Sequence, residues 1–142
     1  MSIVSIIITL IILLIIAAIS KAVMDTVDFK FNKSIFSKIK SEKKRLWFNQ
    51  SQGWKNKYKN SDPEQGPAFP GSTTVFVFIT DAWHFFQMIM LTCYQIAYAL
   101  PIALIIGQYV IPITIGIILL SKFFSGTVFE LFWDKIFMIE KD

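Results

Sequence analysis

The apolar residues of this 142-residue chain fall into two long blocks, residues 3–19 and 74–124, and most of its lysine and arginine lies between them. A charged side chain at the centre of a bilayer costs about 2.5 to 3.5 kcal/mol on insertion scales, so a membrane-spanning chain requires this segregation. Hydrophobic residues make up 54% of the sequence, more than in an ordinary small soluble domain. The sequence therefore predicts an all-α, polytopic integral membrane protein that forms a single membrane domain, residues 1–142.

Three transmembrane helices are expected. The first block predicts a helix over about residues 3–20, because about 20 apolar residues in helical conformation cross a hydrocarbon core of about 30 Å. A cleavable signal peptide is the alternative, but no basic residue precedes the run. The second block predicts a hairpin of helices over about residues 81–106 and 111–124, with Thr80 as a possible N-cap and a turn at GQYVIP. We expect the tail, residues 125–142, to lie at the membrane interface, either along the cytoplasmic surface or as a continuation of the third helix.

The connecting segment and linker, residues 21–72, set the expected orientation. Residues 21–59 carry eleven of the fourteen basic residues. The positive-inside rule places such a segment in the cytoplasm, which puts the N-terminus outside and the C-terminus inside. Anionic lipid headgroups are the partner that this charge predicts.

The sequence SIFSKIKSEKKRLWF predicts an amphipathic interfacial helix, because Ile35, Phe36, Ile39 and Leu46 recur near helical spacing. A solvated basic loop is the alternative. The residues expected to anchor the segment at the headgroups are aromatic or basic: Trp47, Trp54, Lys43, Lys44, Arg45, Lys55 and Lys57. Aromatic rings among lysines also suit single-stranded nucleic acid. Such a site needs no membrane hairpin, so no nucleic-acid partner is expected.

The second predicted span carries a polar stripe along its length. At 100° per residue, its polar side chains fall within an arc of about 160°, with Cys93 on the opposite side. The stripe consists of Thr80, Asp81, His84, Gln87, Thr92, Tyr94, Gln95 and Tyr98. Lipid offers these groups no hydrogen bonds, so the stripe is expected to face other helices or water.

Asp81 and His84, at positions i and i+3, have two interpretations. In the structural one, Asp81 favours the positive end of the helix dipole and His84 satisfies a nearby polar group. In the functional one, the pair is a proton relay, an ion-binding position or a general base, with Asp25 or Asp28 as a third member. One histidine and one cysteine give no metal-ligand spacing, so no metal or other cofactor is expected.

Three stretches, AVMDTVDFKFNKSIF, WKNKYKNSDPEQG and GSTTVFVFITDAWHFFQ, resemble sequences of small uncharacterised membrane proteins from Bacteroidota-type bacteria and their phages. The similarity covers residues 22–87. The resemblance implies a bacterial cytoplasmic (inner) membrane, and it brings no activity, cofactor or site residue.

The chain carries no recognised catalytic signature, and we expect a non-enzymatic role. A three-helix chain hides only part of the stripe, which predicts a homo-oligomer or an accessory subunit of a larger membrane complex, with the stripe as a helix interface or the lining of a narrow pore. The first alternative is a membrane enzyme or an ion or proton carrier that uses Asp81 and His84 at the cytoplasmic interface. The second is a phage-type protein that permeabilises the membrane.

Overall fold

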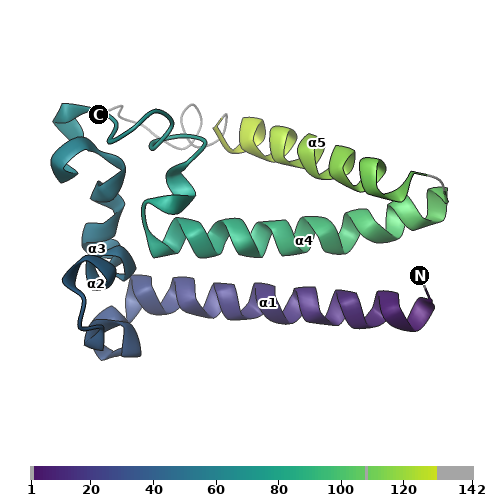
Figure 1. Cartoon of the computed structure of the whole chain (residues 1–142), viewed down its shortest axis with the longest axis horizontal. Coiled ribbons are helices and arrows are strands. Elements are labelled where there is room, and N and C mark those ends of the chain that lie inside the picture. Colours follow the sequence, from purple (N-terminus) through teal and green to yellow (C-terminus); the bar gives the residue numbers. More distant parts are fainter. Residues whose placement is uncertain (1, 108, 131–142) are drawn as a thin grey trace. The chain divides into compact units, whose positions relative to one another are not determined.

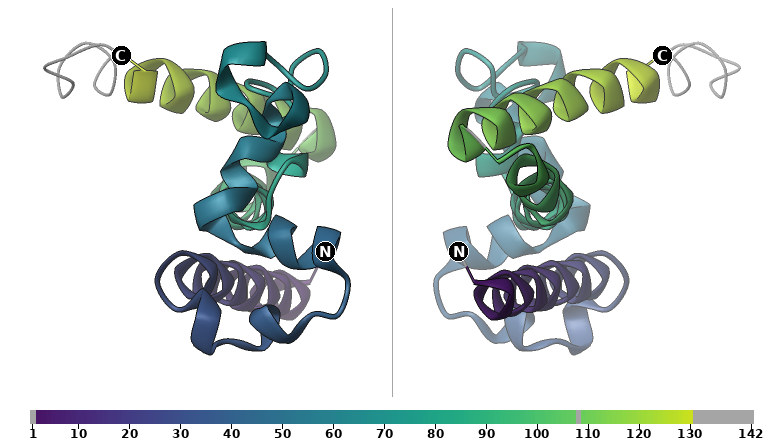
Figure 2. Two further views of the ribbon diagram at one scale, coloured as in Figure 1. Left: turned by 90° about the vertical axis from the view of Figure 1, so that its left-hand side faces the viewer. Right: turned by 90° about the vertical axis from the view of Figure 1, so that its right-hand side faces the viewer.

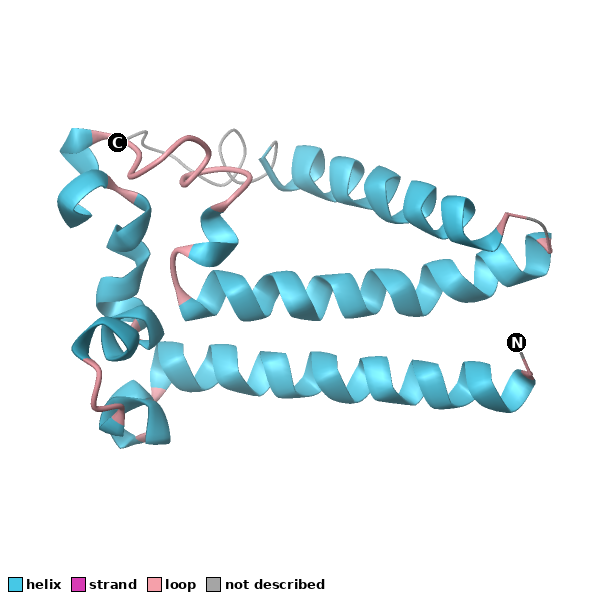
Figure 3. Ribbon diagram, viewed as in Figure 1, coloured by secondary structure: helices cyan, strands magenta, loops and turns pink. Residues whose placement is uncertain are grey.

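The computed structural model describes residues 2–107 and 109–130. Within these residues every regular element is a helix, as Figure 3 shows. The chain divides into two compact units, residues 11–93 and residues 1–10 with 94–142. The elements of each unit are described separately below.

Helix α1 runs from Ile3 to Phe29, past the end expected near residue 20 (Figure 1). Its last turns are polar but remain helical, since Lys21 pairs with Asp25 one turn on and the Thr26 hydroxyl donates to the Ala22 carbonyl at 2.7 Å. At 1.5 Å per residue the 27-residue helix is about 40 Å long, longer than a hydrocarbon core of about 30 Å.

The apolar side chains of α1 are mostly exposed. Only 11% of its most apolar stretch is buried inside the chain, and the buried positions Ala17, Ser20, Met24 and Val27 follow a single face. The core helix of a soluble protein is buried along most of its length. Two helices, α1 and α4 (Ala82–Ile106), are long and apolar enough to cross a membrane.

Helix α4 begins one residue after the expected start and continues through Pro101 to Ile106. Gly107 then takes the left-handed conformation, with φ at 83°, and α5 turns back over Val110–Glu130 (Figure 1). This helix extends beyond residue 124, so residues 125–130 continue it, which is one of the two arrangements expected for the tail. The rest of that tail, residues 131–142, lies outside the described residues. The apolar part of α5, Val110–Phe124, is shorter than the two candidate spans.

The connecting segment is a chain of short helices, which Figure 2 shows lying across the end of α1. The elements are η1 (Phe31–Lys33), η2 (Ile35–Lys38), α2 (Glu42–Phe48), α3 (Gln50–Gly53), η3 (Trp54–Lys57), η4 (Lys59–Ser61), η5 (Pro63–Gln65) and η6 (Val77–Ile79).

The single amphipathic helix expected around residues 35–46 is absent from this segment. The backbone is extended at Ile39, which separates η2 from α2. The break allows Phe36 to stack on Phe48 with ring centroids 4.6 Å apart. In one continuous helix these residues would be about 18 Å apart along the axis. Aromatic stacking therefore favours the broken path over the periodic one.

Candidate functional site

Asp81 lies directly before the first turn of α4, and its side chain is fully buried. One carboxylate oxygen, Oδ1, accepts the backbone N–H of His84 at 3.0 Å, which is the hydrogen bond of a helix N-cap. The other, Oδ2, lies 3.3 Å from the Thr80 hydroxyl. The N-cap is therefore Asp81 and not Thr80, whose hydroxyl donates to the Val77 carbonyl at 2.7 Å. The carboxylate gains further from the positive end of the helix dipole.

The imidazole of His84 forms a further hydrogen bond with the Asp81 carboxylate. Its Nδ1 lies 2.7 Å from Asp81 Oδ2, and the His84 side chain is 20% exposed. An ionised carboxylate only accepts hydrogen bonds, so Nδ1 is the donor whenever Asp81 is ionised. When the ring is neutral, Nε2 keeps its lone pair and can accept a proton or bind a cation. The ring of Trp83 contacts His84 edge-on, with centroids 5.1 Å apart.

The connecting segment closes over the start of α4 through Gly53. A Cβ atom at Gly53 would lie 3.3 Å from Asp81 Cβ, 2.9 Å from the Leu46 carbonyl oxygen and 3.2 Å from the Trp47 carbonyl oxygen. Only a residue without a side chain allows α3 to approach both α2 and Asp81 this closely.

Two side chains of the connecting segment bind the carbonyls that precede α4. The Trp47 indole N–H donates to the Ile79 carbonyl at 3.2 Å, and the Asn56 amide donates to the Thr80 carbonyl at 3.0 Å. These carbonyls lie outside the helix and need such partners when they are covered. The two bonds fix the peptide units immediately before Asp81.

The linker after η5 is tied to the same segment. Ser72 is fully buried, and its hydroxyl donates to the Lys57 carbonyl at 2.6 Å. The same carbonyl accepts the Ala68 N–H at 2.9 Å. The chain that leads into α4 is thus held on η3, the element that also supplies Asn56.

The proposed third acidic member does not join the pair. Asp25 forms its ion pair with Lys21 on α1. In the described part of the chain, neither Asp25 nor Asp28 hydrogen-bonds to Asp81 or His84, and no group of three His, Cys, Asp or Glu side chains is placed to hold a metal ion.

The predicted stripe on α4 divides into a covered and an uncovered part. Thr80, Asp81 and Gln95 are buried, and His84, Gln87 and Thr92 are half-buried. Tyr94 and Tyr98 are 43% and 41% exposed. The uncovered arc continues along α4 as Leu91, Ile102 and Ile105.

The residues expected to anchor the chain at the headgroups have different surroundings within the chain. Trp47 packs within the chain, 5.7 Å from the Phe85 ring. The Trp54 ring contacts Tyr58 edge-on. The ammonium groups of Lys55 and Lys57 lie over the Trp54 ring, 5.6 and 6.0 Å from its centroid. Lys43 and Lys44 are exposed, and Arg45 is half-buried.

Gly53 and Asn56 are the site residues that sequence analysis missed. Each acts on a residue 24 or more positions away, and neither lies in a periodic pattern or motif that marks such a contact.

Comparison of the chain with protein-family models, curated proteins and solved structures gave no match.

Proposed function

We propose that the chain is a three-span protein of a bacterial inner membrane and acts as a non-enzymatic subunit that assembles through α4. The membrane placement is supported by the long exposed apolar surfaces of α1 and α4, where only 11% and 22% of the most apolar stretch is buried. α5 supplies the third span. The basic connecting segment faces the cytoplasm with the C-terminus.

The observation that supports assembly is the position of Tyr94 and Tyr98. Tyr94 lies 12 residues into the 25-residue helix α4, about 18 Å from its start and near the middle of a span. A tyrosine side chain at that depth is too short to cross the half-thickness of about 15 Å to reach water. Tyrosines exposed to lipid concentrate at the interfaces, where the hydroxyl is hydrated.

A partner helix packed against α4 would give the hydroxyls of Tyr94 and Tyr98 hydrogen-bond partners within the membrane. Within the described residues neither hydroxyl has a hydrogen-bond partner. Interhelical hydrogen bonds satisfy such groups in membranes and contribute about 0.6 kcal/mol each on average. The exposed arc of α4 is therefore assigned as the interface, with a second copy or another membrane subunit opposite it.

Site-specific photo-crosslinking in native membranes tests this assignment. A benzophenone amino acid replaces Tyr94 or Tyr98, and matched controls carry it at Ile12 or Ile15 of α1, which are 51% and 53% exposed. We expect protein adducts from the α4 positions and lipid adducts from the α1 positions. An added mass of 16.3 kDa identifies a second copy, and any other mass identifies a different subunit. Lipid adducts alone at Tyr94 and Tyr98 would refute the proposal.

Removing only the hydroxyls gives a finer test. The double variant Tyr94→Phe/Tyr98→Phe keeps both rings and loses two interhelical hydrogen bonds, about 1 kcal/mol together. The dimer, or the complex with another subunit, should then dissociate about fivefold more readily. An unchanged dissociation constant would contradict the assigned role of the hydroxyls.

The geometry of His84 favours a second candidate function, a proton or ion carrier or a membrane enzyme. A buried carboxylate that orients Nδ1 and leaves Nε2 available is an arrangement suited to proton transfer. Wild-type proteoliposomes loaded with a pH-sensitive dye should then conduct protons, and His84→Gln should abolish the flux while assembly stays intact. Flux equal to that of empty liposomes would exclude the carrier.

A further inference from the structure

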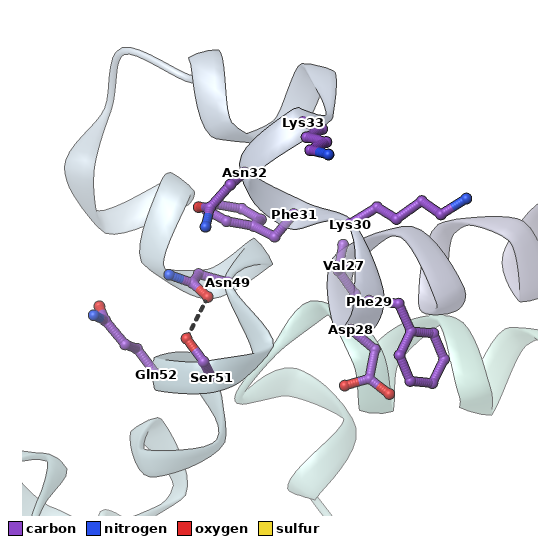
Figure 4. Close-up of a pocket in the computed structure, with 10 residues that line it drawn as sticks. All are labelled: Val27, Asp28, Phe29, Lys30, Phe31, Asn32, Lys33, Asn49, Ser51 and Gln52. Atoms are coloured by element: carbon purple, nitrogen blue, oxygen red, sulfur yellow. Dashed lines mark hydrogen bonds between the residues drawn. The ribbon is translucent and has the colours of Figure 1, made fainter.

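A pocket of about 830 Å³ lies at the end of α1, within the unit of residues 11–93. Figure 4 shows that its lining comes from the end of α1 with η1 and from the junction of α2 and α3. The lining residues are Val27, Asp28, Phe29, Lys30, Phe31, Asn32, Lys33, Asn49, Ser51 and Gln52. Its volume falls within the range of roughly 300 to 1,000 Å³ that small-molecule sites occupy.

The pocket combines cations with hydrogen-bonding groups. Lys30 and Lys33 supply two ammonium groups, and Asn32, Asn49 and Gln52 supply amides. The Ser51 hydroxyl donates to Asn49 Oδ1 at 2.8 Å, which orients the Asn49 amide N–H groups away from Ser51 (Figure 4). Ammonium and amide donors together are the chemistry that binds a phosphate oxygen.

The remaining polar residue and the apolar residues distinguish a lipid from a free anion. Asp28 contributes a carboxylate, which a free phosphate would avoid and which the hydroxyl or ammonium end of a phospholipid headgroup can contact. Phe29 and Phe31 give the pocket apolar surface, and Phe29 is 76% exposed, whereas Val27 is buried beneath them. Such a surface suits the glycerol and upper acyl chain of a lipid.

The position of the pocket relative to the membrane also favours a phospholipid headgroup as its ligand. An α1 of about 40 Å exceeds a hydrocarbon core of about 30 Å, so its final turns extend into the headgroup layer. The pocket begins at Val27, in the last turn of this helix. This step rests on the proposed membrane placement of α1, and it is independent of assembly through α4.

We propose that this pocket binds the headgroup of one membrane phospholipid, with Lys30 and Lys33 holding the phosphate and Asp28 facing the far end of the headgroup. Figure 4 shows the Lys30 side chain extended away from Asn49 and Gln52, and its flexible four-carbon stem lets it turn toward a phosphate held by Lys33. Lys30 and Lys33 are exposed, and the site differs from the diffuse attraction expected of scattered lysines because side chains of two separate segments line one open pocket.

Native mass spectrometry of the detergent-solubilised full chain tests the site. Phosphatidylglycerol and phosphatidylethanolamine are titrated separately, and diacylglycerol serves as the control ligand without a phosphate. We expect one phospholipid per chain and at least tenfold weaker binding by the Lys30→Gln/Lys33→Gln variant. The matched variant Lys43→Gln/Lys44→Gln removes the same charge from exposed positions outside the pocket and should bind like the wild type.

Three outcomes would overturn the proposal. Equal losses in the two double variants would indicate non-specific charge attraction, binding of diacylglycerol as tight as that of phospholipid would exclude a phosphate site, and displacement by millimolar inorganic phosphate would indicate a free-anion site. Ser51→Phe keeps every charge and places a ring in the pocket, so it should also weaken binding. It tests the site independently if the lysine variant is poorly folded.

The same spectra separate this inference from the proposed function. They report the number of chains and the number of lipids in each particle. A lipid-bound monomer would count against assembly alone, whereas an oligomer without bound lipid would count against the pocket alone.

Discussion

The Gly53→Ala substitution probes the contact that brings the connecting segment onto the start of α4. The added methyl group would lie 2.9 and 3.2 Å from the carbonyl oxygens of Leu46 and Trp47, and 3.3 Å from Asp81 Cβ. Two of these atoms belong to the backbone, so no side-chain rotation relieves the overlap. Helix α3 must shift away from α2, from Asp81 or from both.

The expected cost follows from two opposing terms. Overpacking of a close-packed site costs about 1 to 3 kcal/mol. Gly53 has helical dihedral angles, φ −59° and ψ −32°, so alanine also gains about 0.5 to 1 kcal/mol in conformational entropy. The middle values of the two ranges give a net destabilisation of about 1 kcal/mol, which corresponds to an open population about fivefold larger.

Hydrogen exchange followed by mass spectrometry measures this opening directly. The amides of His84 and Phe85 are bonded to the Asp81 carboxylate and carbonyl, so a peptide that contains them reports whether the helix start is held. The control is Gly116→Ala in α5, where a Cβ atom meets nothing within 4 Å. If Gly53→Ala exchanges as slowly as this control, the close approach of α3 to Asp81 is refuted.

Two further pairs of variants test the hydrogen bonds around the site by thermal unfolding in detergent. Asp81→Ala removes the N-cap and should cost about 1 to 2 kcal/mol, whereas Asp81→Asn keeps a capping oxygen and should cost less; equal losses would contradict the capping role. Asn56→Leu leaves the covered Thr80 carbonyl without its donor and should cost about 1 to 3 kcal/mol. Ser72→Ala should cost less, because the Lys57 carbonyl still accepts from the Ala68 N–H. A larger loss from Ser72→Ala would reverse the expected order.

Sequence patterns located the helices better than the contacts between them. The helix expected over residues 81–106 is observed at Ala82–Ile106, because a long apolar run next to a capping residue defines a start, and Gly107 defines an end. The periodicity of residues 35–46 predicted one helix and missed the break at Ile39. Helical spacing carries no information about the Phe36–Phe48 stack that favours the broken path.

At the candidate site, too, the sequence predicted local spacing but not the contacts between separate elements. Asp81 and His84 were paired from their i, i+3 spacing, which any helix imposes. The identity of the N-cap, the burial of the carboxylate and the roles of Trp47 and Asn56 depend on residues from separate elements. The stripe was predicted to be one polar face, and its division into a buried part and an exposed part could not be read from helical spacing.

The sequence by itself determined that the chain is helical, which segments are apolar enough for a membrane, and where the positive charge gathers. Each of these properties is a sum of contributions from individual residues, such as the transfer free energy of each side chain. Local composition and periodicity therefore reveal them. Only the tertiary structure decided that Gly53, Trp47 and Asn56 close over Asp81, and that a pocket forms where α1 meets the α2–α3 junction. Such contacts join residues up to 32 positions apart, and they depend on the path of the whole connecting segment and on steric fit.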